Sequence, residues 1–570
     1  MKKRIAIFGG GVGGLSVAHE LSKFPEYKLN LYEKKTELGG LARSSRDLDG
    51  CVTEYCWRVY FGFYANLLKI LKEIPLVEDT KKSVFDNLTV YRHINISDSS
   101  TPLKDWLLAL YKIFYGFTSC DARLDKLDNT TWWQALGASK ESGLFKEIGA
   151  WLGMDRYKGS FKSVVKVGME LHMLNTFFSR KYKDFVTTKS TSEAWFDNWK
   201  KALLDKKVNL NLEQELWRLQ VKNNQIQAAE VMDIKSKKIT RIVADKYVLS
   251  LPIEALANLV EKTPSLKVGD LNNAKKLKET CYQMQLSFQV FFDRKISLGS
   301  FDKSGKNNSF LLVDSPWDLI VLSYDQVYAG TKLSNKLPGV KGGWSVAACT
   351  TYIPGIVYKK PMDECSYQEI ITELWAQLTE SKELRKIVKE NNTFELSKDR
   401  VIKWSPMWPT YSTDQKGRLT TTEPKFTNNA GSYALRPSYK TPFNNLYIAS
   451  AYVKETIDVF SMEAAAYAGK SVAKEIETRA TPVFTKSRPP IFSPFRKIDA
   501  VLYKYNFPNM YPLLVLSFMF FLITLLIYFI FSRWGQLPIQ FQGIVWNLQK
   551  NFNLLSNIFR LHGRIIPGLL

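Results

Sequence analysis

The chain has 570 residues, of which 45% are hydrophobic and 24% charged, so it can bury a large core but is too long for one small unit. These proportions exclude a disordered or fibrous protein, and a mean hydropathy of -0.19 excludes a polytopic membrane protein over most of the length. The net charge of +24 favours nucleic acid or an anionic membrane surface as a partner.

The N-terminal residues predict a nucleotide-binding turn. An apolar run at 4–8 is typical of a buried strand, and Gly9-x-Gly11-x-x-Gly14 follows it and leads into a helical pattern. The first glycine permits a tight turn, the second lets backbone approach a pyrophosphate, and the third packs helix on strand. A second predicted strand ends at Glu33, whose carboxylate is suited to accept hydrogen bonds from ribose hydroxyls.

Two stretches after this turn carry a resemblance to a known superfamily. The segment TELGGLARSS, with Gly39, Gly40 and Arg43, resembles the second glycine element of the flavin amine oxidases and phytoene desaturases. Residues 49–71 are similar to the plant and cyanobacterial carotenoid desaturases. The resemblance implies FAD as the cofactor, with both glycines and the arginine close to it.

Later blocks extend the resemblance over roughly residues 4–475. In VNLNLEQELWRLQV it places Leu216 near adenine, and in the closing block NNLYIASAYVKETIDVFSMEAAAYAGKSVA it places Ser450 and Met462 at the flavin. One departure stands out, because Ser450 and Ala451 replace the Gly-Asp pair of the desaturases. The carboxylate that usually contacts the cofactor at that position is therefore absent.

Arg58 is the candidate catalytic residue. By the resemblance it lies beside the isoalloxazine, where a cation would stabilise negative charge that develops on the reduced flavin. The alternative is an arginine that binds backbone carbonyls or pairs with Glu54. Trp404, Trp408 and Tyr411 could form the walls of a substrate amine site, or could simply pack. The six cysteines and four histidines show no metal-ligand spacing, so we expect no metal site.

The C-terminal region predicts a membrane anchor. Residues 512–531 form an uncharged apolar run long enough to cross a bilayer. Apolar residues at helical spacing in 532–570 predict an amphipathic tail. Residues 481–570 carry nine basic residues and one acid, whereas no basic cluster typical of a nucleic-acid reader appears elsewhere. We therefore expect a single-pass membrane protein with its catalytic part in the cytosol, and no nucleic-acid partner.

The predicted fold is α/β, with a Rossmann-type FAD-binding domain into which an α+β substrate domain is inserted, and a C-terminal transmembrane helix. We assign the FAD-binding domain to residues 1–95, 200–265 and 400–478. The substrate domain takes 96–199 and 266–399. A basic linker, 479–511, leads to the membrane segment.

The predicted function is hydride transfer from an apolar, isoprenoid-like substrate to flavin N5, with the electron acceptor left open. One alternative is an amine oxidase that uses oxygen. The other is a flavin-containing isomerase or a protein that holds FAD as a structural element, which the departure at Ser450 and Ala451 motivates.

Overall fold

The computed structural model describes residues 2–56, 58–98, 101–137, 153–167, 183–283, 286–300, 305–328, 331–405, 408, 410–454, 458–484, 492–512 and part of 515–527. The predicted tail at 532–570 lies outside the described residues, and so does much of the predicted span at 512–531. Among the residues that are described, no helix combines the length and the apolar character that a bilayer crossing needs. The transmembrane helix is therefore not confirmed.

Five parallel strands form the sheet that the glycine motif predicted. Their order is β22 (Leu446–Ile448), β12 (Lys246–Leu249), β1 (Lys3–Phe8), β2 (Tyr27–Glu33) and β8 (Asn209–Leu212). The apolar side chains of β1 are fully buried because a strand in the middle of a parallel sheet is covered on both faces. The Rossmann-type α/β fold is thus confirmed.

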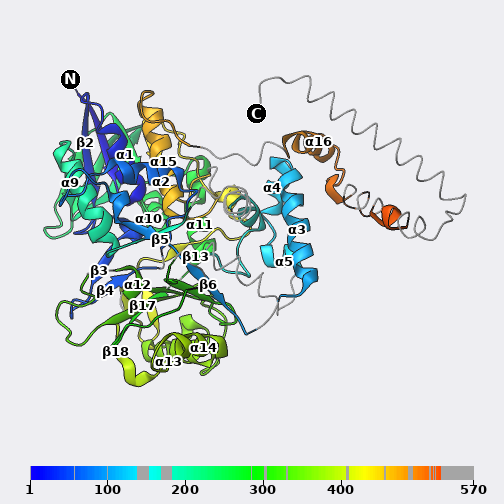
Figure 1. The fold of residues 1–570 in the computed structure, drawn as a ribbon. Helices are drawn as coiled ribbons and strands as arrows, with labels where there is room; N and C mark the ends of the chain where they lie inside the picture. The colour runs from blue at the N-terminus through cyan, green and yellow to red at the C-terminus, as the bar shows by residue number, and fades with distance from the viewer. Residues whose placement is uncertain are drawn as a thin grey trace, which may run out of the picture. The chain divides into compact units, whose positions relative to one another are not determined.

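Two helices far apart in the sequence pack closely beside this sheet, α1 (Val12–Leu21) and α15 (Met462–Ile476), as Figure 1 shows. A Cβ on Gly469 of α15 would lie 2.4 Å from the carbonyl oxygen of Gly13 in α1. Glycine at position 469 therefore lets the two helix backbones approach each other.

One hydrophobic core is shared by this sheet, an antiparallel meander and two helices. The meander consists of β9 (Gln214–Lys222), β10 (Gln225–Asp233) and β11 (Ile239–Ile242). The helices are α10 (Ile253–Lys262) and α11 (Ala274–Thr280). The loop that leads into β9 thereby reaches the same edge of the parallel sheet as the glycine turn.

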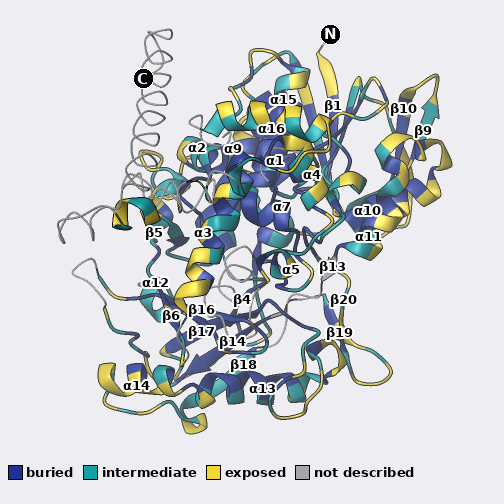
Figure 2. Cartoon of the chain, turned by 90° about the vertical axis from the view of Figure 1, so that its right-hand side faces the viewer, coloured by how far each residue is buried: buried dark blue, intermediate teal, exposed yellow. Residues whose placement is uncertain are grey.

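The other large sheet has six strands and is mostly antiparallel. Its order is β18 (Val401–Ser405), β14 (Leu286–Phe292), β17 (Gly342–Ala348), β16 (Leu319–Ser323), β15 (Ser309–Leu312) and β6 (His93–Ile96). Two helices, α13 (Tyr367–Glu380) and α14 (Lys382–Asn391), share one hydrophobic core with it and lie together at the foot of Figure 1. Figure 2 shows its strands buried and the outer side of α14 exposed.

The remaining described helices and strands lie outside the two large sheets and their packed helices. The helices are α2 (Ala65–Glu73), α3 (Leu103–Thr118), α4 (Asp121–Leu127), α5 (Trp132–Leu136), α7 (Phe161–Ser163), α9 (Asp197–Asp205), α12 (Tyr324–Val327) and α16 (Ser493–Lys504). The strands are β3 (Ser44–Arg46), β4 (Val52–Glu54), β5 (Leu88–Val90), β7 (Phe185–Thr187), β13 (Tyr282–Gln283), β19 (Tyr411–Thr413), β20 (Leu419–Thr421) and β21 (Lys425–Phe426).

The chain divides into two compact units. The large unit contains residues 1–116 and 124–490 with both sheets, and the small unit contains residues 117–123 and 491–570 with α16. All five parallel strands come from segments assigned to the FAD-binding domain, but the six-stranded sheet also takes β18 and most of β6 from those segments. The predicted domain boundaries stay a prediction.

Candidate functional site

A cavity of about 600 Å³ lies at the carboxyl ends of four parallel strands. Its walls include Gly9 after β1, Glu33 at the end of β2, Ser250 after β12, and Ala449 with Ser450 after β22. In open parallel sheets ligands bind outside the carboxyl ends of the strands. The cavity is therefore the candidate site of the dinucleotide.

The three motif glycines are required for different reasons. Gly9 has a φ of +105°, and a Cβ there would lie 2.2 Å from the carbonyl oxygen of Ser250. A Cβ on Gly14 would lie 2.1 Å from the carbonyl oxygen of Gly9. By contrast, the nearest described atom to a Cβ on Gly11 would be the Cα of Gly40 at 4.0 Å, and Gly11 lines the cavity. The protein itself needs Gly9 and Gly14, whereas only a ligand needs Gly11.

Two helix N-termini face this cavity. The first residues of α1 line it after Gly11, and α15 contributes its cap Ser461 and its first residue Met462. A helix N-terminus carries unpaired N–H groups and a partial positive charge, so it favours an anion. The carboxylate in the first turn of α15 belongs to Glu463, which accepts N–H bonds from Asn66 and Leu67 instead. Glu463 is not among the residues that line the cavity.

Glu33 and Leu216 also line the cavity, as the sequence predicted for the adenosine half of a dinucleotide. The Glu33 carboxylate accepts the backbone N–H of Gly10 at 2.6 Å and that of Lys35 at 2.9 Å. The Ser450 hydroxyl donates to the carbonyl of Leu251 at 3.2 Å. These side chains lie on the cavity wall. Their predicted contacts with FAD stay predictions.

The second glycine element closes over the first. The N–H of Gly39 donates to the carbonyl of Gly10 at 2.8 Å, and Gly39 and Gly40 both have positive φ, 111° and 56°. Both glycines line the cavity, but Arg43 is not among the lining residues. Its guanidinium donates to the carbonyl of Gly40 at 2.6 Å and lies 4.5 Å from the Trp408 ring centroid.

The residue that holds Arg43 in place was not predicted from the sequence. Glu423, in the loop between β20 and β21, receives a bond from Arg43 at 3.2 Å and from the Trp408 indole at 2.7 Å, and it pairs with Lys35. Glu423 and Lys35 both line the cavity. No motif surrounds Glu423 in the sequence, so no local signal could have identified it.

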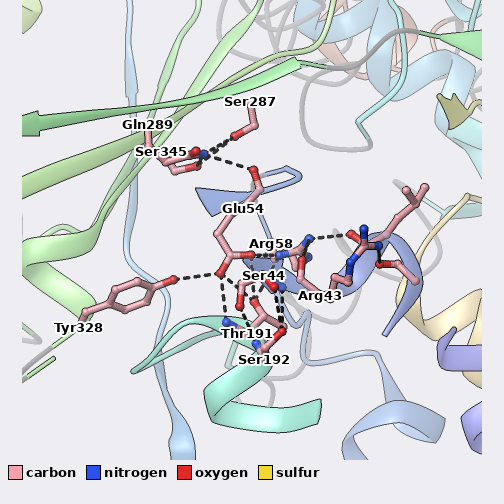
Figure 3. A network of polar contacts seen from close by, with 12 residues as sticks. Arg43, Ser44, Glu54, Arg58, Thr191, Ser192, Ser287, Gln289, Tyr328 and Ser345 are labelled. Atoms are coloured by element: carbon pink, nitrogen blue, oxygen red, sulfur yellow. Dashed lines mark hydrogen bonds and ion pairs between the residues drawn. The ribbon is translucent and has the colours of Figure 1, made fainter. Parts of the chain in front are cut away.

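Arg58 lines the cavity and belongs to a buried polar network (Figure 3). It forms an ion pair with Glu54, and its other amino group donates to the carbonyls of Leu41 at 2.7 Å and Arg43 at 3.1 Å. Glu54 also accepts the N–H of Thr191 at 3.0 Å. These contacts are the ones expected if Arg58 has a structural role, in which it binds backbone carbonyls and pairs with Glu54. Arg58 nevertheless lines the cavity.

The charge of Arg58 is fixed by this network. Burial is the largest single influence on the pKa of Arg58 and lowers it, but Glu54 together with Tyr60 and Cys56 outweighs burial, so the net pKa of Arg58 is raised. Arg58 is therefore a permanent cation in the wall of the cavity. Its predicted catalytic role stays a prediction.

The aromatic residues proposed for an amine site do not line the cavity. Trp404, Trp408 and Tyr411 are absent from its described walls, and the Trp408 ring is fully buried against Tyr55. The aromatic side chains that do line it were not predicted from the sequence to form the walls of a substrate site, although Phe61 and Tyr64 lie in the segment that resembles the carotenoid desaturases. The lining aromatic residues are Phe8, Tyr32, Tyr55, Phe61, Phe63, Tyr64, Trp217 and Phe460.

Comparison with known proteins agrees with this geometry. A family model described as an NAD(P)-binding Rossmann-like domain matches residues 7–74. Zeta-carotene desaturase of Solanum lycopersicum is 37% identical over 73 residues, which are 13% of this chain and 12% of that protein. The 15-cis-phytoene desaturase of Synechococcus elongatus is 36% identical over 73 residues, 13% of this chain and 15% of the relative.

Solved structures extend the likeness to most of the chain, as fold alone. A putrescine oxidase structure has a TM-score of 0.54 at 14% identity and covers 84% of this chain and 100% of its own. Cyclohexylamine oxidase of Brevibacterium oxydans has a TM-score of 0.52 at 13% identity, with 84% and 100% covered. The predicted resemblance to the FAD-dependent desaturase and amine oxidase superfamily is confirmed. The sequence match spans only about an eighth of the desaturases' length.

Proposed function

We propose that this chain, which has the fold of the FAD-dependent desaturases and amine oxidases, binds FAD and transfers hydride from an apolar substrate to it. The proposal rests on one observation. Gly11, which has no side chain, and the N-termini of α1 and α15 all line the same cavity. A pyrophosphate fits this combination, because it is anionic and needs close approach to backbone.

The residues present fit FAD. Glu33 and Leu216 stand on the part of the wall that suits adenosine, and Ser450 and Met462 stand on the part that suits the ribityl chain and ring. Bound FAD would supply a two-electron acceptor. Arg58, held by Glu54, would place a fixed positive charge beside that acceptor and stabilise negative charge in the transition state.

The substrate end of the cavity favours an apolar molecule. Ile320 in β16 and Cys349, directly after β17, bring the six-stranded sheet to the cavity wall, and Val167 and Cys56 line the cavity as well. Aromatic rings line the cavity and would suit a neutral polyene as well as an ammonium, so a carboxylate without an ion-pair partner would be the feature that favours an amine. The nearby Glu423 is already paired with Lys35 and Arg43. We therefore favour removal of hydride from a carbon atom of a neutral, polyene-like substrate over amine oxidation.

The decisive experiment is anaerobic reduction of the purified full chain. We expect flavin absorbance that is bleached by a C40 polyene and is unaffected by a panel of primary amines and polyamines. Hydrogen peroxide release with an amine would reverse the order of these two reactions. A bound flavin that no substrate bleaches would favour the isomerase or structural alternative, and a preparation without flavin would overturn the proposal.

A membrane anchor is the second part of the proposal. It is supported by the uncharged run at 512–531 and by the nine basic residues against one acid in 481–570. We expect the full chain to stay in the membrane pellet after alkaline carbonate extraction. Release into the supernatant would reject the anchor without affecting the flavin proposal.

A further inference from the structure

Helix α16 (Ser493–Lys504) is held to the small unit by one buried carboxylate. Asp499 is fully buried and accepts the N–H of Cys120 at 2.7 Å and the Arg123 guanidinium at 3.0 Å. The guanidinium also lies 5.1 Å from the Tyr503 ring centroid. These contacts define the inner face of α16, so the opposite face is turned away from its support.

The opposite face of α16 is apolar and exposed. Ile498 is 46% exposed, Val501 58% and Tyr505, which directly follows the helix, 65%. At 100° per residue these three positions fall within about 60° of one another and point away from Asp499. Phe507, two residues later, is 59% exposed. Large apolar side chains gathered in this way on a surface indicate a binding face.

The charges around this face have one sign. Lys497 and Lys504 are exposed and, seven residues apart, lie on the same side of the helix beside Val501. Within 492–512 the only acid is Asp499, which is buried in its ion pair with Arg123. Lysines at the border of an apolar face extend their ammonium groups into water or toward phosphates while their stems cover apolar surface. The face is therefore complementary to an anionic, apolar partner.

A lipid leaflet meets this description better than a second copy of the chain. A second copy would carry the same positive charges, and these would repel Lys497 and Lys504, whereas anionic headgroups attract both lysines. The chain also runs directly from α16 toward the uncharged apolar segment at 512–531. Interfacial helices have this arrangement of an apolar face between basic side chains.

We propose that α16 is an interfacial membrane helix that lies on an anionic leaflet through Ile498, Val501 and Tyr505, with Lys497 and Lys504 at the phosphates. This role goes beyond the proposed flavin chemistry and does not depend on it. It also differs from a simple anchor, because it fixes the depth and the headgroup preference of a helix outside the apolar run.

Photocrosslinking of the full chain in lipid nanodiscs tests the proposal. One preparation contains phosphatidylserine with a photoactivatable acyl chain, and the other contains the matching phosphatidylcholine. We expect lipid crosslinks within residues 493–507, at least five-fold more abundant with the anionic lipid. Crosslinks confined to 512–570, equal yields with both lipids, or crosslinks between two protein chains at this face would each overturn it.

Pairs of substitutions test whether the exposed face of α16 is responsible for the lipid crosslinks. Ile498→Asp with Val501→Asp, and Lys497→Glu with Lys504→Glu, are each expected to reduce the 493–507 crosslinks at least five-fold. The control is Ile239→Asp, because Ile239 in β11 is 47% exposed and equally apolar, and it is expected to leave the yield within two-fold. Unchanged flavin absorbance and thermal midpoint show that the variants are folded. Unchanged crosslinking in both pairs would reject the inference.

Discussion

Gly11 faces the cavity, while Gly9 and Gly14 face backbone, so alanine at these positions should separate ligand binding from folding. We expect Gly11→Ala to keep the thermal midpoint of the flavin-free protein but to lose at least ten-fold in FAD affinity, because its Cβ occupies the path of a pyrophosphate. Fluorescence titration of the flavin-free protein measures this affinity.

Gly9→Ala is the matched control, because its Cβ would meet the Ser250 carbonyl and strain a positive φ. We expect it to lower the thermal midpoint as well as the affinity. If Gly11→Ala bound FAD as tightly as the natural chain, the cavity would not be a pyrophosphate site of the proposed kind.

The buried pair of Glu54 and Arg58 allows the two interpretations of the arginine to be distinguished. We expect Glu54→Gln to cost about 3–5 kcal/mol of stability, because it leaves the Arg58 cation without its ion-pair partner. The double variant Glu54→Gln, Arg58→Met removes both charges and should recover part of that loss. Chemical denaturation measures both values.

The same double variant tests catalysis. If Arg58 stabilises reduced flavin, the double variant should have a lower flavin reduction potential than the natural chain and slower substrate bleaching. An unchanged potential in a stable double variant would assign Arg58 a structural role only.

Residue-level prediction from the sequence succeeded where a motif encodes backbone geometry. The glycines at positions 9, 11, 39 and 40 line the cavity. Gly14 does not line it, but its packing against the carbonyl of Gly9 supports the turn behind the wall. The prediction for Arg43 was less successful. A resemblance to a family cannot show that the Arg43 guanidinium pairs with Glu423, which is far away in the sequence. Side chains that meet through tertiary folding leave no local pattern.

At the scale of elements, Glu463 joins the starts of two helices. It lies in the first turn of α15, and its carboxylate caps α2 through the N–H groups of Asn66 and Leu67 at 3.0 and 2.7 Å. Burial raises the pKa of Glu463 to about 7. The capping bonds oppose that shift but do not cancel it.

This raised pKa gives a pH prediction. The unfolded chain releases the Glu463 proton near pH 4.5 and the folded chain near pH 7, so the stability contributed by the proton is present below pH 4.5 and lost as pH rises through 7. We expect Glu463→Gln to become more stable relative to the natural chain across this window, by up to about 3 kcal/mol.

Thermal midpoints of both proteins between pH 4.5 and 8 measure this difference. Met462 and Ser461 are unchanged in the variant, so the cavity-facing start of α15 serves as an internal control through FAD affinity. A difference in stability that does not vary with pH would show that Glu463 is ionised throughout the range.

The first two strands of the parallel sheet were predictable because β1 has a buried apolar run before a glycine turn and β2 ends at an acid, Glu33. The six-stranded sheet was not described strand by strand from the sequence, although its core is equally buried. Its strands pair across long loops and with β6 from the N-terminal segment. Such pairing depends on tertiary contacts and has no fixed sequence spacing.

For the whole molecule, the family match at residues 7–74 does not mark a folding unit. β1 lies between β2 and β12, and the four apolar residues at its end are fully buried. We expect a fragment of residues 1–75 to show no cooperative thermal transition by circular dichroism and no FAD binding, because one side of β1 would lack its neighbour. Cooperative unfolding with FAD binding by this fragment would contradict that expectation. The full chain is the positive control.

The order of strands in the parallel sheet also bears on synthesis. β1 and β2 leave the ribosome first, but β12 ends at Leu249, and β22 and the start of α15 appear only after Leu446. Because Ser450 and Met462 complete the cavity wall, nascent chains that stop short of α15 have no finished site. FAD loading would therefore come late in translation, and truncated products would accumulate without the cofactor that could stabilise them.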